Sequence, residues 1–166
     1  MRTLAGRLAL TAAVAAIIVL VAAEVAAAST VVAVSLWDKG AETTMATGMA
    51  YGTAGADMSK ATMGIKASPA TAKAGVVTFK VTNDSRDTVH EMIVMTLAEP
   101  PTALPYIDNE MRVDEDKSGD KGEVSELDPG KSGALTVNLK PGNYVLICNV
   151  PGHFAAGMWT EFTVTK

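Results

Sequence analysis

The chain places a thiol, an imidazole and a thioether at even five-residue intervals near its C-terminus, at Cys148, His153 and Met158. Cys148 is the only cysteine of the 166 residues, and His90 is the only other histidine. One thiolate, two imidazoles and a weak thioether are the ligands of a mononuclear copper site that transfers electrons. The sequence therefore predicts one metal site formed by His90, Cys148, His153 and Met158, with no thiol or imidazole left over.

Each of these residues has an ordinary structural interpretation when it is taken alone. A strand histidine such as His90 is often hydrogen-bonded in a core, His153 follows a Pro-Gly turn and fits an exposed loop, and Met158 fits core packing. The prediction therefore depends on the combination. Zinc is the alternative ion, but structural zinc sites use four strong ligands, whereas copper accepts a weak thioether as its fourth.

The pattern C-x4-H-x4-M with one upstream histidine resembles the cupredoxins, and its spacing is most similar to that of rusticyanin-like and auracyanin-like members. The resemblance covers roughly residues 60 to 166. It implies a Greek-key β-sandwich that holds one copper ion cycling between Cu(I) and Cu(II). It also implies that the loop histidine reaches the surface inside an apolar patch, here supplied by Val150, Pro151, Phe154, Ala155 and Ala156.

This chain departs from the better-known members beside His90. Azurins and plastocyanins carry an asparagine there, which helps to tie the two ligand loops together. Here Val89 precedes His90 and Glu91 follows it, and Glu91 is interpreted as a solvated strand residue.

The elements that must position these residues are strands, because apolar and polar residues alternate with period two from residue 75 onward. Val77, Phe79 and Val81 share one face, as do Tyr144 and Leu146 with Cys148. No sustained helical stripe occurs outside the N-terminal segment, so the prediction is an all-β sandwich. The expected strands cover residues 31–36, 62–67, 77–81, 88–97, 135–139, 143–148 and 158–165.

Two stretches show no clear period. Residues 38–61 are interpreted as a mobile loop or linker, and the methionines around them are open to a second reading as ligands for cuprous ion: Met45, Met49, Met58 and Met63. Residues 98–131 are interpreted as a long connection across one end of the sandwich. Its acidic run from Asp108 to Asp128 is either a solvated loop or a docking surface for a basic, cytochrome-like partner.

The N-terminal segment 1–28 is predicted to be an export signal, because Arg2 and Arg7 precede an apolar run that ends in small residues. An uncleaved membrane anchor is the alternative. The predicted organisation is then a signal or anchor over 1–28, an N-terminal strand with a flexible segment over 29–61, and a cupredoxin domain over 62–166. The expected location is the periplasm or another extracytoplasmic compartment. A lone thiol in such an oxidising compartment is protected when a metal occupies it.

The function expected from these features is one-electron transfer between redox proteins, such as a cytochrome or a membrane oxidoreductase. Catalysis is not expected, because four ligands close the metal and a catalytic metal needs an open position. Nucleic acid is not expected as a partner, because the chain carries a net charge of −4 and offers no excess of cations for phosphate groups. Two rivals stay open: a periplasmic protein that binds copper for delivery or tolerance, and a metal-free interaction sandwich.

Overall fold

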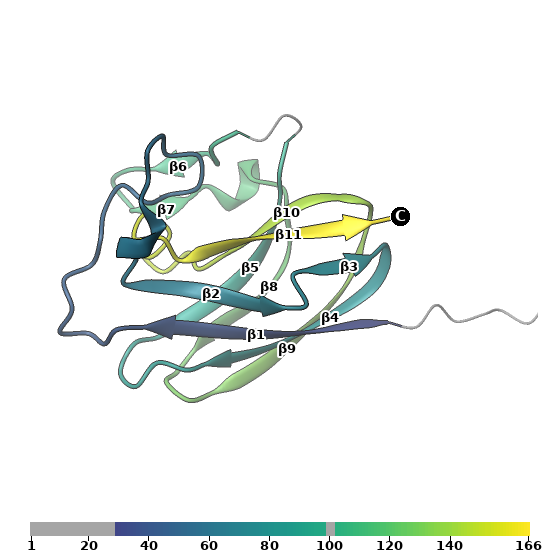
Figure 1. Ribbon diagram of the computed structural model, residues 1–166, viewed down its shortest axis with the longest axis horizontal. Coiled ribbons are helices and arrows are strands. Elements are labelled where there is room, and N and C mark those ends of the chain that lie inside the picture. Colours follow the sequence, from purple (N-terminus) through teal and green to yellow (C-terminus); the bar gives the residue numbers. More distant parts are fainter. Residues whose placement is uncertain (1–28, 99–101) are drawn as a thin grey trace, which may run out of the picture.

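The computed structural model describes residues 29–98 and 102–166, which form a sandwich of two β-sheets (Figure 1). The predicted export signal or anchor over 1–28 lies outside the described residues. Within the described ranges, no helix is both long and apolar enough to cross a bilayer. The all-β sandwich predicted from the alternating pattern is confirmed.

The first sheet has the strand order β2-β1-β4-β9, and the second has the order β3-β11-β10-β5-β8. β1 runs parallel to β4, and β11 runs parallel to β3, whereas the other pairs within the two sheets are antiparallel. The first sheet comprises β1 (Thr30–Asp38), β2 (Met63–Ser68), β4 (Gly75–Asn83) and β9 (Ser132–Leu139). The second comprises β3 (Thr71–Lys73), β5 (His90–Thr96), β8 (Asp120–Leu127), β10 (Gly142–Ile147) and β11 (Trp159–Thr165).

Three smaller elements complete the described chain. A short hairpin is formed by β6 (Tyr106–Ile107) and β7 (Arg112–Val113), and two 3-10 turns are η1 (Met58–Lys60) and η2 (Glu115–Lys117). In Figure 1 the hairpin lies at the same end of the sandwich as the loop that joins β10 to β11.

The main core lies between the two sheets and follows the alternation of the sequence. Val77, Phe79 and Val81 of β4 are fully buried there, and the Phe79 ring meets Phe162 of β11 edge to face, with 5.2 Å between ring centroids. Tyr144, Leu146 and Cys148 contribute to this core from β10 and the position just after it. Each group of three residues therefore shares one face, as the sequence predicts, and both faces are turned toward the main core.

The second sheet is buried on both faces, which explains why β5 reads as a continuous apolar run. Met92 and Val94 face the main core, whereas Ile93 and Met95 face a second cluster on the outer side. Side chains from the irregular segments, the hairpin, the β10–β11 loop and the start of β11 cover that outer cluster: Tyr51, Leu97, Val113 and Phe154, with Ala50, Leu104, Tyr106 and Trp159.

Residues 38–61 supply part of this cover. Met49 and Tyr51 are buried, the Trp159 indole Nε1 donates to the Met49 carbonyl at 2.7 Å, and the Tyr51 ring packs edge to face on Trp159. The interpretation of this segment as a mobile loop or linker does not account for these contacts. β1 is also paired on both sides, with β2 and β4, so residues 30–38 lie inside the sandwich.

The interpretation of residues 98–131 as one long connection is wrong, because Asp120–Leu127 forms β8, the edge strand beside β5. Its sequence shows no alternation of apolar and polar residues, because Val124 is the only buried residue of this strand. An edge strand with one covered side needs few apolar residues, and its charged side chains discourage pairing with another chain.

Candidate metal centre

Three metal-ligating atoms converge at the end of the sandwich where β5 begins and β10 ends. His90 Nδ1 lies 3.2 Å from His153 Nδ1. Cys148 Sγ lies 3.4 Å from His153 Nδ1 and 3.9 Å from His90 Nδ1. His90 and Cys148 are fully buried and His153 is 6% exposed. The structure therefore brings together three of the four residues that the sequence predicts as ligands, in a site shielded from water.

These separations match what a single ion requires. An ion bound at about 2.0 Å from each imidazole nitrogen and about 2.3 Å from a thiolate sulfur holds such donors roughly 3.3 to 3.8 Å apart. The observed donor separations of 3.2, 3.4 and 3.9 Å bracket this range. The three donor atoms therefore lie close enough together to bind one copper ion.

The protonation behaviour of the three groups also suits a cation. Burial and the neighbouring His90 lower the pKa of His153 to about 4, and burial lowers the pKa of His90, so both imidazoles are neutral and free to bind. Burial raises the pKa of the Cys148 thiol to about 12, although backbone N–H groups of Glu91 and Val150 favour the thiolate. A thiolate at this position needs a positive partner, and a bound metal supplies one.

A tight turn carries the imidazole of His153 back to the thiol of Cys148. The His153 N–H donates to the Val150 carbonyl, and the Met158 N–H donates to the His153 carbonyl, both at 3.0 Å. Gly152 and Gly157 adopt φ of 85° and 97°, a left-handed region that a side chain at either position would strain. These two glycines allow the loop to turn, so that residues five positions apart in the sequence lie close together in space.

Met158 closes the same loop, because the Cys148 N–H donates to its carbonyl at 3.0 Å. Its side chain is fully buried in the main core cluster that also contains Cys148. The backbone therefore holds Met158 next to the thiol residue, within the core.

Asp38 contacts the centre from β1, and sequence reasoning missed it. Its Oδ2 lies 2.7 Å from His90 Nε2, the nitrogen that faces away from Cys148, and its side chain is only 4% exposed. Burial alone would raise the pKa of this carboxyl, but hydrogen bonds from Ser85, His90 and the Gly40 N–H outweigh burial and lower the pKa. No local signal marks Asp38, because the contact depends on the pairing of β1 with strands far along the chain.

Glu91 is buried, so its interpretation as a solvated strand residue is wrong. Its Oε1 accepts the Asn149 N–H at 2.9 Å, and its own N–H donates to Cys148 Sγ at 3.5 Å. Burial and the negative charge of Glu123 raise the pKa of Glu91 to about 7. Glu91 thus joins the strand of His90 to the loop of Cys148, which is the role that the resemblance described above gives to an asparagine in azurins and plastocyanins.

Asn149 extends this connection to the hairpin. Its Oδ1 accepts the Val113 N–H at 2.6 Å, and its Nδ2 donates to the Val113 carbonyl at 3.0 Å and to Glu115 Oε1 at 2.7 Å. The Gly152 N–H donates to the Met111 carbonyl at 2.9 Å. The hairpin and η2, distant in sequence, therefore pack directly on the ligand loop.

The surface over His153 differs from the apolar patch that the sequence predicts. Phe154 and Ala156 point inward and are buried, whereas Pro151 is exposed. His153 lines a cavity of about 220 Å³ together with Met45, whose methyl group lies close to Gly152. Side chains from the irregular segments thus complete a surface that the ligand loop does not form alone.

Comparison with known families and structures agrees with this geometry. A family model of the sulfocyanin (SoxE) domain matches residues 69–166, a range that contains His90, Cys148, His153 and Met158. Comparison with curated proteins by sequence finds no match.

Among solved structures, a dithionite-reduced auracyanin from the photosynthetic bacterium Roseiflexus castenholzii is 19% identical, with 84% of this chain and 99% of that chain covered and a TM-score of 0.51. A structure of the copper protein rusticyanin is 16% identical, with 83% and 80% covered and a TM-score of 0.50. Rusticyanin from Thiobacillus ferrooxidans is 17% identical, with 83% and 79% covered and a TM-score of 0.49.

The structural similarity to auracyanin and rusticyanin shows a shared fold, and the family match spans more than half of the chain. Together with the buried cluster of two imidazoles and one thiol, they establish that the chain belongs to the sulfocyanin (SoxE) family and that its cupredoxin fold binds a single copper ion.

Proposed function

We propose that the protein is an exported one-electron carrier whose copper is held by His90, Cys148, His153 and Met158. The observation that carries this proposal is the convergence of His90 Nδ1, His153 Nδ1 and Cys148 Sγ within 4.8 Å of one another in a buried site. Bound copper would alternate between Cu(I) and Cu(II) and so carry one electron at a time. Membership of a copper-binding family supports the same proposal.

The chain's own contribution is to hold the donors still and to exclude water. His90 comes from β5, which is hydrogen-bonded on both sides, by β10 and β8. The loop of Cys148 and His153 is fixed by its own turn and by the contacts of Asn149. Electron transfer is fast when little rearranges, so a donor set fixed by the fold suits a carrier better than a protein that must release its ion.

His153 is the proposed route for electrons. The other three proposed ligands are 0% exposed, whereas His153 is 6% exposed and borders the cavity beside Met45. A partner that docks on this end of the sandwich therefore approaches the imidazole of His153 most closely.

The export proposal depends on segment 1–28. An apolar run after two arginines is typical of a secretory signal, and retention of the segment would anchor the protein to a membrane. A fully buried lone thiol is compatible with an oxidising compartment, because burial and a bound metal both protect it from oxidation.

Exchange of Cys148 for serine tests the proposed function. Wild-type protein loaded with Cu(II) should be intensely coloured by charge transfer from the thiolate, and Cys148→Ser should lose that absorption. Visible spectroscopy and electron paramagnetic resonance of both proteins provide the measurement. Colour retained in Cys148→Ser would refute the assignment. Reversible reduction with the copper retained favours a carrier over the rival delivery protein, whereas ready transfer of Cu(I) to an acceptor favours delivery.

Exchange of Met158 tests the fourth ligand. The axial ligand tunes the reduction potential of such sites, and the oxygen of glutamine is a stronger donor to Cu(II) than a thioether. Met158→Gln should therefore lower the potential while copper stays bound. Protein-film voltammetry gives the potential, and Met158→Leu, which offers no donor atom, should instead raise it. An unchanged potential in both variants would remove Met158 from the ligand set.

The stability of the metal-free protein should depend on Glu91, because its carboxylate holds the strand of His90 to the loop of Cys148. Glu91→Ala leaves the buried Asn149 N–H without an acceptor, which should cost about 1 to 3 kcal/mol in the free energy of unfolding. Glu91→Gln keeps an oxygen at that position and should lose less. Urea unfolding of the metal-free proteins measures both values, and equal stability of Glu91→Ala and wild type would show that the contact contributes nothing.

The turn of the β6–β7 hairpin is the proposed docking site for a basic redox partner. Asp108, Glu110 and Met111 are exposed there, and the Met111 carbonyl accepts the Gly152 N–H of the ligand loop. Asp114 and Glu115 belong to the structural framework instead, because Asp114 caps η2 and Glu115 accepts from Asn149.

Neutralising the exposed pair should slow association with a basic cytochrome. Asp108→Asn with Glu110→Gln should reduce the association rate and its salt dependence, because surface charges act over about 8 Å at physiological ionic strength. Asp120→Asn with Glu161→Gln is the matched control, since it removes the same charge away from the ligand loop. Stopped-flow rates provide the measurement. Equal rates for both double variants would exclude the hairpin as the docking site.

A further inference from the structure

We propose that Asp38 is a positioning residue that lowers the reduction potential of the copper centre through its hydrogen bond to His90. This inference rests on the proposed function. Asp38 belongs to β1, which supplies no metal ligand, and yet it would set part of the reduction potential of the site.

The contact between Asp38 and His90 fixes which nitrogen of the imidazole binds metal. Asp38 Oδ2 lies 2.7 Å from His90 Nε2, and the two side chains are 4% and 0% exposed. A carboxylate only accepts, so the proton of the neutral ring lies on Nε2. The lone pair of Nδ1 is then directed at Cys148 Sγ and His153 Nδ1.

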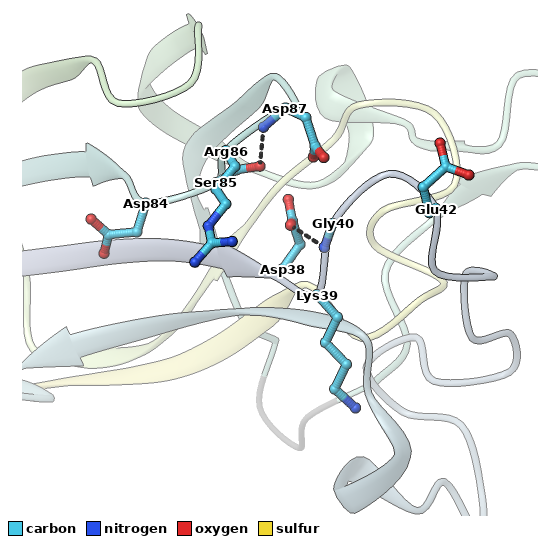
Figure 2. A pocket seen from close by; sticks show the side chains of 8 residues that line it. All are labelled: Asp38, Lys39, Gly40, Glu42, Asp84, Ser85, Arg86 and Asp87. Atoms are coloured by element: carbon cyan, nitrogen blue, oxygen red, sulfur yellow. Dashed lines mark hydrogen bonds between the residues drawn. The ribbon is translucent and has the colours of Figure 1, made fainter.

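The carboxylate of Asp38 is itself held on both oxygens. Its Oδ1 accepts the Gly40 N–H at 2.7 Å, as Figure 2 shows. The Ser85 hydroxyl accepts the N–H groups of Asp87 and Thr88 at 3.2 and 2.9 Å, which leaves its own proton for Asp38. Asp38 therefore cannot rotate away from His90 without breaking several hydrogen bonds.

The negative charge of Asp38 is directed at the imidazole. The surrounding cavity of about 590 Å³ carries further carboxylates from Glu42, Asp84 and Asp87, and its cations are Lys39 and Arg86 (Figure 2). Within the part of the chain that the structure describes, the only ion-pair contact of Asp38 is with His90. No lysine or arginine there neutralises the carboxylate at close range.

This arrangement favours the oxidised state of the centre. The His90 N–H is a stronger donor when its ring bears more positive charge, and hydrogen bonds to a charged acceptor are roughly twice as strong as neutral ones. The bond to Asp38 therefore stabilises the oxidised state more than the reduced state. The potential is lower with the carboxylate in place than without it.

The test compares Asp38→Asn with Asp87→Asn in copper-loaded protein. Asp38→Asn should weaken Cu(II) binding about 10- to 100-fold and Cu(I) binding less, so the potential should rise. Each tenfold difference between the two affinities corresponds to about 59 mV. Asp87→Asn removes a charge from the same cavity without touching His90, and Asn keeps an oxygen for the Ala41 N–H, so the potential should change little. Chelator competition and voltammetry give the affinities and the potential.

A second measurement uses the wild-type protein and so does not depend on whether a variant folds. Nitrogen-detected NMR of the Cu(I)-loaded wild type should show a slowly exchanging proton on His90 Nε2. The inference is overturned if the His90 ring carries no proton on Nε2. It is also overturned if Asp38→Asn weakens the binding of Cu(I) and Cu(II) equally and leaves the reduction potential unchanged, or if Asp38→Asn and Asp87→Asn shift the reduction potential by the same amount. Wild-type protein that shows no thiolate-to-copper absorption would refute the proposed function itself, so the two failures can be told apart.

Discussion

The rest of the structure depends on the register between β5 and β10, because that pairing sets the thiol beside the first imidazole. Ile147 pairs with Ile93, so the next positions bring Cys148 and Asn149 alongside Met92 and Glu91. A slip of one residue would turn Cys148 to the other face of the sheet and break the donor cluster. Burial on both faces of the second sheet resists such a slip, since Ile93 and Ile147 fill the outer cluster while Met92 and Leu146 fill the main core.

The sequence predicted what local spacing determines. Alternation identified the core strands, and the five-residue intervals identified three groups of the C-terminal loop, because a tight turn with Gly152 and Gly157 keeps residues close in sequence close in space. It failed where partners are distant. Asp38 and Glu91 are ordinary carboxylates in the sequence, and only the pairing of β1, β5 and β10 turns them inward. β8 escaped recognition because an edge strand with one buried side chain resembles an acidic loop.

Two buried carboxylates hold the two sides of the centre by different means. Asp38 bonds to a ligand imidazole directly, so its charge acts on the ring of His90. Glu91 bonds to the backbone of Asn149, so its effect is on the distance between strand and loop. Buried carboxylates are expensive to desolvate unless they are hydrogen-bonded. Both are hydrogen-bonded in the structure, which indicates that the site organises a polar layer around donors that the apolar core alone would leave unsupported.

That polar layer also links the centre to its surface. Asn149 joins Glu91 to Val113, and Val113 ends the hairpin whose turn presents Asp108 and Glu110 to solvent. The segment on which a partner would dock is thus attached to the loop that holds His153, the proposed ligand with the most exposure. Since the loop is fixed from both sides, docking on the hairpin need not move the ligands. A partner can then gain contact area beside His153 while the geometry that favours rapid electron transfer stays as the fold has set it.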